Sequence, residues 1–217
     1  PGSPAAWLAA PRQPRRQEFM VDGIACRNLE ATIIGSNRLK ETIVVGAHYD
    51  SVAGTVGADD NASAVAVQLE TARQVMALKS SKNLDLSVVF VSFALEEPPA
   101  YGTRFMGSRV YAKQARSRQE RIDGMICLKM VGYSCSESGC QSYPFPLMFF
   151  GYPTDGNFIG IVGNFGSLGL TRSIFNRFQK NPELFFLLES ICNGLAGFAA
   201  PHDLQLRRPH EFKEFID

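Results

Sequence analysis

The stretch from Ile43 to Asn61 constrains the fold more than any other part of this 217-residue sequence. It begins with a run of β-branched and small apolar residues, IVVGA, which is typical of a strand buried on both faces in a parallel sheet. We expect the strand over 43–48, and a glycine-rich loop then leads to a helix expected over 61–79, where apolar residues recur on one face. A buried strand followed by an amphipathic helix indicates an α/β fold.

Two further apolar segments repeat this arrangement. Residues 87–94 predict a second buried strand and residues 125–128 a third, with a helical pattern between them at 106–115. The alternation of strands and helices predicts right-handed crossovers and a mainly parallel sheet with helices on both faces. The expected fold class is therefore a three-layer α/β/α arrangement around a mixed, mostly parallel sheet.

The N-terminal part has different patterns. Residues 1–16 are rich in Pro, Ala and Arg, and we expect them to be a disordered lead-in to a domain spanning 17–182. Between Glu18 and Ile34, two short alternating stretches predict an antiparallel pair of strands at the edge of the sheet.

The C-terminal part has weaker patterns. Residues 143–165 are dense in Phe, Pro and Gly, and predict a long loop with one short strand that either lines a pocket or covers a small apolar cluster. Helices are expected over 171–178 and 184–195, and a polar tail without an evident pattern follows them.

Composition excludes some classes of partner. Charged residues make up 20% of the chain and the net charge is +1, so electrostatics give no reason to expect nucleic acid or a membrane surface as partner. No apolar run reaches the roughly 18 to 20 residues that span a bilayer. No signal peptide is visible at the start, which leaves both a cytoplasmic and a secreted protein open. Cys135 and Cys140 bracket the short loop SESG and could form a disulfide in an oxidising compartment.

Polar residues follow each of the three core strands. They are His48 and Asp50, then Glu96 and Glu97, then Lys129, with Asp59 and Asp60 at the start of the intervening helix. Because the carboxyl ends of parallel strands meet at one edge of a sheet, we expect these residues to converge on one site. Histidine and carboxylates are residue types that hold zinc, although Asp60 by itself would equally suit a helix cap.

The motifs HYDS, GADDN, EE followed by MGS, and MVGY resemble, in this order, those of the zinc exopeptidase family. That family includes bacterial leucyl aminopeptidases, aminopeptidase Y, glutamate carboxypeptidase II, the transferrin receptor ectodomain and glutaminyl cyclases. The resemblance covers roughly residues 17–182 and leaves 183–217 as a divergent tail. It implies a zinc-dependent aminopeptidase that acts on peptides and uses two zinc ions.

The resemblance also implies a role for each matching residue. His48 would bind the first zinc, Asp60 would bridge both ions, and Glu97 would bind the second. Asp50 would orient the His48 ring. Glu96 would be the general base, taking a proton from the attacking water and returning it to the leaving amine. Two ions about 3.5–4 Å apart would activate the water and polarise the scissile carbonyl together.

The sequence departs from the family at two places. Lys129 stands where the family has an acidic ligand of the first zinc, and a protonated ammonium cannot ligate a metal. We expect its side chain to swing outward, the alternative being a neutral buried lysine that ligates. The family's last histidine, from an SDH motif, is absent, and the remaining histidines, His202 and His210, are expected to be surface residues rather than ligands.

These departures leave two other functions open. One is a non-catalytic, degenerate peptidase-like domain retained for binding. The other is a glutaminyl-cyclase-like acyl transferase, which would use a single zinc on the same scaffold.

Overall fold

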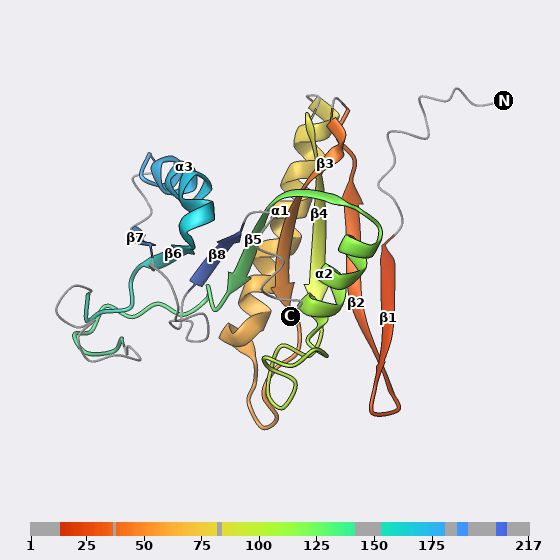
Figure 1. Ribbon diagram of the computed structural model, residues 1–217. Coiled ribbons are helices and arrows are strands. Elements are labelled where there is room, and N and C mark those ends of the chain that lie inside the picture. Colours follow the sequence, from red (N-terminus) through yellow and green to blue (C-terminus); the bar gives the residue numbers. More distant parts are fainter. Residues whose placement is uncertain are drawn as a thin grey trace.

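The computed structural model describes residues 14–36, 38–81, 84–141, 153–180, 186–190 and 203–207. Within these ranges, one eight-stranded sheet has the order β1-β2-β4-β3-β5-β8-β6-β7 (Figure 1). Its centre is formed by β3 (Arg38–His48), β4 (Leu86–Phe93) and β5 (Arg121–Lys129), and β3 pairs in parallel with both neighbours. The three predicted core strands are confirmed, and their carboxyl ends lie along one edge of the sheet.

Helices cover both faces of this sheet. On one face, α1 (Ala64–Ser81) and α3 (Leu168–Phe178) pack against a cluster that includes Val45 and Ala47. On the other face, α2 (Gly107–Ser117) packs against a cluster that includes Val44. Successive residues of β3 point to opposite faces, so a continuous apolar run supplies both clusters. This confirms the predicted three-layer α/β/α fold class.

The N-terminal hairpin extends the sheet on one side. β1 (Arg15–Val21) pairs antiparallel with β2 (Ile24–Ile33), and β2 pairs antiparallel with β4. The predicted antiparallel edge pair is therefore confirmed. β1 begins inside the stretch predicted to be disordered, since Arg15 pairs with Glu30 and forms an ion pair with it at 2.8 Å. Residues 1–13 of that stretch lie outside the described residues.

The C-terminal part differs from the prediction. The expected short strand is present as β6 (Ile159–Gly163). The prediction of a helix over 184–195 is wrong, because part of this range forms the strand β7 (Phe186–Ser190), which pairs in parallel with β6. A short consecutive apolar run suits a strand as well as a helix, and an available strand edge decides between them.

The tail also contributes to the sheet. β8 (Asp203–Arg207) pairs antiparallel with β5 and in parallel with β6. Its sequence, DLQLR, alternates polar and apolar residues, which is a strand signal that the prediction of a patternless tail overlooked. Residues 142–152, within the expected Phe-rich loop, and both tail histidines, His202 and His210, lie outside the described residues.

Two further expectations concern a disulfide in the loop after β5 and the lack of a membrane-spanning segment. Cys135 and Cys140 form a disulfide, with their Cα atoms 6.4 Å apart, and Cys135 also forms a β-bridge with Gly156. Among the helices that the structure describes, none combines the length and apolar character needed to cross a bilayer.

Candidate metal and catalytic site

His48 is the last residue of β3 and lies at the centre of the site. Its side chain is 4% exposed. Ring atom Nδ1 lies 3.1 Å from the backbone oxygen of Asp50 and 3.5 Å from the Asp50 carboxylate. A hydrogen on Nδ1 donated to Asp50 leaves the lone pair of Nε2 directed into the site. Asp50 thus lies where the prediction placed it, and its backbone oxygen makes the closer contact.

Asp60 enters the site from an irregular turn, Ala58–Ser63, that precedes α1. Asp60 and Asn61 have non-helical backbone angles there, and the residue preceding the turn is Gly57. The Asp60 carboxylate approaches His48, with Oδ1 3.0 Å from Nε2. Asp60 therefore points into the site instead of capping the helix, which was the alternative interpretation.

Glu96 and Glu97 follow the end of β4. Leu95, directly before them, has a φ of 59°, a left-handed conformation that costs energy for a residue with a side chain and is concentrated at functional sites. Glu96 Oε2 lies 3.6 Å from His48 Nε2. The backbone N–H of Glu97 donates to Asp50 Oδ2 at 3.0 Å. The two adjacent carboxylates thus reach the same site.

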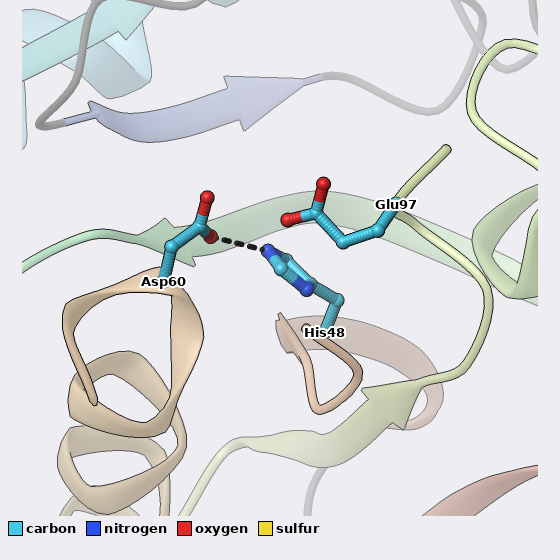
Figure 2. Close-up of side chains that lie close together, drawn as sticks. All are labelled: His48, Asp60 and Glu97. Atoms are coloured by element: carbon cyan, nitrogen blue, oxygen red, sulfur yellow. Dashed lines mark ion pairs between the residues drawn. The ribbon is translucent and has the colours of Figure 1, made fainter. Parts of the chain in front are cut away.

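The three predicted metal ligands converge. Figure 2 shows the side chains of His48, Asp60 and Glu97 pointing toward one another. Their possible ligand atoms all lie within 4.8 Å of one another. Glu97 Oε1 is buried and has no hydrogen-bond partner among the described residues. Because a buried oxygen without a partner is costly, this atom fits a site for a cation.

Lys129, the last residue of β5, points into this cluster. Its Nζ lies 3.0 Å from Asp60 Oδ1, 3.1 Å from His48 Nε2, 3.4 Å from Glu96 Oε2 and 3.9 Å from Glu97 Oε1. Burial lowers the pKa of Lys129, but the carboxylates of Glu96, Asp60 and Glu97 raise that pKa more, and it lies above its ordinary value. The expectation that the side chain swings outward is wrong, because three carboxylates attract the ammonium into the cluster.

The neighbouring charges and burial also shift the pKa values of the other groups in the cluster. Burial raises the pKa of Asp50, but hydrogen bonds from the His48 ring and the Glu97 N–H bring that pKa below its usual range. Burial and the carboxylates of Asp60 and Glu96 raise the pKa of Glu97, against the opposing effect of Lys129. Burial lowers the pKa of His48, while Asp50 and Glu96 raise it to a net value above normal. A cluster with this excess of carboxylates attracts cations.

The donor atoms present fit a zinc ion. Histidine nitrogen and carboxylate oxygen bind zinc at roughly 2.0–2.2 Å, and His48, Asp60 and Glu97 supply both. Lys129 Nζ, however, lies within 3.1 Å of both His48 Nε2 and Asp60 Oδ1, the two atoms that would bind the first zinc implied by the resemblance. The ammonium thus contacts His48 and Asp60 and lies farther from Glu97, at 3.9 Å from its Oε1.

Two residues of the turn before α1 hold this site together: Asn61, which the sequence patterns did not single out, and Asp59, which was expected among the converging polar residues. Asn61, 1% exposed, donates from Nδ2 to the backbone oxygens of His48 and Leu128 at 3.3 and 3.2 Å, and its Oδ1 accepts from the Met130 N–H at 3.0 Å. Asp59 Oδ1 accepts from the N–H groups of Gly132 and Tyr133. Both lie in the motif GADDN, but their hydrogen-bond partners are distant in the sequence and become apparent only in the folded chain.

Replacing Asn61 with Ala is expected to lower the free energy of unfolding by about 2–4 kcal/mol, because three backbone groups lose their hydrogen bond to Asn61, two of them buried and one half-buried. Urea unfolding followed by circular dichroism measures this change. Asn176→Ala, at an exposed position of α3, is the matched control and should stay within about 0.5 kcal/mol. Equal effects of the two substitutions would contradict the role given to Asn61.

Comparison with known proteins identifies the family of this chain. Residues 28–145, more than half of the chain, match the sequence profile of peptidase family M28. The chain belongs to peptidase family M28. The matched range contains every residue of the site, and the resemblance to zinc exopeptidases is thereby confirmed.

Curated relatives of this M28 chain are longer than the chain itself. It is 40% identical over 140 residues to the uncharacterized protein YfbL of Escherichia coli strain K12, covering 61% of this chain and 41% of that protein. It is 30% identical over 135 residues to a probable zinc metalloprotease of Pyricularia oryzae, covering 55% of this chain and 25% of that protein. The chain thus spans less than half the length of these relatives, and zinc is the metal that the family implies.

Solved structures share the fold of this M28 chain at low identity. The LapA aminopeptidase of Legionella pneumophila matches with a TM-score of 0.59 and 15% identity, over 89% of this chain and 48% of that one. A glutaminyl cyclase of an Acidobacteriales bacterium matches with a TM-score of 0.57 and 16% identity, over 89% of this chain and 63% of that one. An aminopeptidase and a cyclase match equally well, so the fold alone does not distinguish the two reactions.

Proposed function

We propose that this chain carries the catalytic centre of a zinc-dependent hydrolase that removes N-terminal residues from peptides. The observation that carries the proposal is the convergence of His48, Asp60 and Glu97 at one point above the carboxyl ends of the strands. Probable zinc metalloproteases among the relatives support the same reaction class.

Each residue of the cluster has a task in this reaction. Zinc, when bound, supplies a Lewis acid that polarises the scissile carbonyl and acidifies the attacking water. Asp60 and Glu97 would hold the ion, with His48 beside them and the Lys129 ammonium next to the His48 ring. Glu96, whose Oε2 faces the same point, would accept the proton of the attacking water and donate it to the leaving amine. Asp50 fixes the His48 ring and the Glu97 backbone.

Removing the metal tests the proposal directly. We expect the purified chain to contain zinc at about one equivalent and to hydrolyse amino-acid anilides, with a chelator lowering the rate by at least about 100-fold and added zinc restoring it. Elemental analysis and release of the coloured anilide measure the two quantities. A zinc content near zero after incubation with equimolar zinc would overturn the proposal.

Lys129 favours a second candidate, a domain retained for binding without catalysis. Its ammonium takes a position that the resemblance assigns to a metal ion, as expected of a degenerate site. Bound zinc without hydrolysis of any amino-acid anilide would favour this candidate. The mass of the product separates a cyclase from both, since a cyclase releases ammonia from peptides that begin with glutamine.

A further inference from the structure

The Lys129 ammonium has the surroundings of a bound metal ion. Nζ lies 3.0 and 3.3 Å from the two oxygens of Asp60, 3.1 Å from His48 Nε2 and 3.4 Å from Glu96 Oε2. These atoms come from three separate segments, the end of β3, the turn before α1 and the loop after β4. A surface lysine pairs with a single carboxylate in water, whereas the Lys129 side chain is 18% exposed and faces several lone pairs at once.

The formal charges of the cluster also indicate that the Lys129 ammonium takes the place of a metal ion. The carboxylates of Asp60, Glu96 and Glu97 carry three negative charges around the single positive charge of Lys129. The remainder of minus two would be balanced by one divalent cation. An acidic residue at position 129 together with its own divalent ion would carry a charge of plus one, which is the charge of the ammonium. Lysine therefore replaces a ligand and its ion without changing the total charge of the site.

Two oxygens of the cluster lie farther from the ammonium than its closest partners do. Glu97 Oε1 is buried without a hydrogen-bond partner among the described residues, and at 3.9 Å it is the most distant of the oxygens that pair with Nζ. Asp60 Oδ2 is held more loosely by the ammonium than Oδ1 is. An ion between Asp60 and Glu97 would satisfy both oxygens and would not displace Lys129.

We propose that Lys129 is a built-in cation that takes the place of one metal ion, so that this chain binds a single divalent ion, between Asp60 and Glu97. The inference rests on the proposed function in requiring that the site binds zinc. It goes beyond that function because the Lys129 ammonium, and not a metal ion, fills the position beside His48.

Zinc stoichiometry tests the inference without any measurement of activity. Zinc bound after desalting is measured by elemental analysis, and affinity by competition with a chromophoric chelator. We expect one equivalent in the wild-type chain and two in Lys129→Glu, which removes the ammonium and adds a ligand. Binding of the second ion should be about 100-fold tighter in Lys129→Glu than in the wild type. Lys113→Glu, the same charge change at an exposed position of α2, should stay at one equivalent.

The outcomes separate this inference from the proposed function. Two equivalents in the wild type, or one in Lys129→Glu, would overturn the inference and leave a zinc hydrolase standing, whereas no zinc in either protein would overturn both. If circular dichroism shows that Lys129→Glu does not fold, Lys129→Gln provides the test, because it removes only the positive charge. It should bind zinc about tenfold more tightly than the wild type, and an unchanged affinity would overturn the inference.

Discussion

Replacing Glu96 with Gln is expected to lower the rate of peptide hydrolysis by about 100- to 10,000-fold while leaving the zinc content unchanged. An amide has nearly the same shape as the carboxylate but cannot accept a proton from water and return it to the leaving amine. Glu96 Oε2 is directed to the centre of the site, 3.6 Å from His48 Nε2 and 3.4 Å from Lys129 Nζ. Glu96 is not one of the three residues, His48, Asp60 and Glu97, whose ligand atoms could hold a metal ion.

The measurement is kcat/KM for an amino-acid anilide, with zinc determined on the same samples. Glu18→Gln, at an exposed position of the edge strand β1, makes the same chemical change far from the site and should leave kcat/KM unaltered. A Glu96→Gln variant that keeps both its zinc and its full rate would show that another group transfers the proton. A variant that loses zinc as well would assign Glu96 to metal binding.

Replacing Gly107 with Ala is expected to have the largest effect on stability, lowering the free energy of unfolding by about 3 kcal/mol or more. An added Cβ at this first residue of α2 would overlap Asn28 Oδ1 and the backbone of Ala94. Neither can move away easily. Asn28, which is fully buried, donates to the backbone oxygen of Gly107 at 2.8 Å and accepts from the Ala94 N–H at 3.0 Å. The Gly107 N–H in turn donates to the Ala94 oxygen at 2.8 Å.

Urea unfolding compares Gly107→Ala with Gly156→Ala. Gly156 is also buried, but an added Cβ there would have its nearest neighbour at 3.8 Å, an ordinary contact. The control should therefore change the free energy of unfolding by no more than about 1 kcal/mol. Similar losses in both variants would show that the contact between α2 and the end of β4 is not tight. Because Ala94 lies just before Glu96 and Glu97, Gly107→Ala should also weaken zinc binding.

Local patterns in the sequence determined the core of the fold and the approximate place of the site. The apolar run before His48, and those before Glu96 and Lys129, have the length and composition of buried strands, and β3, β4 and β5 were found there. Parallel strands joined by helices must present their carboxyl ends on the same edge, so the convergence of His48, Asp60 and Glu97 followed from chain order and geometry. Gly107 was recognisable as part of the motif MGS by resemblance. The sequence did not reveal why this position requires glycine, which is the close contact with Asn28 and Ala94.

Tertiary structure decided what depends on residues distant in the sequence. The strand β7 replaced a predicted helix because the edge of β6 was available for pairing, and periodicity carries no information about such an edge. Asn61 became a link between the ends of β3 and β5 only when those ends came together. Lys129 turned inward for the same reason. The direction of a long charged side chain is set by the total charge around it, and here the charge comes from Asp60, Glu96 and Glu97, which only the folded chain brings together.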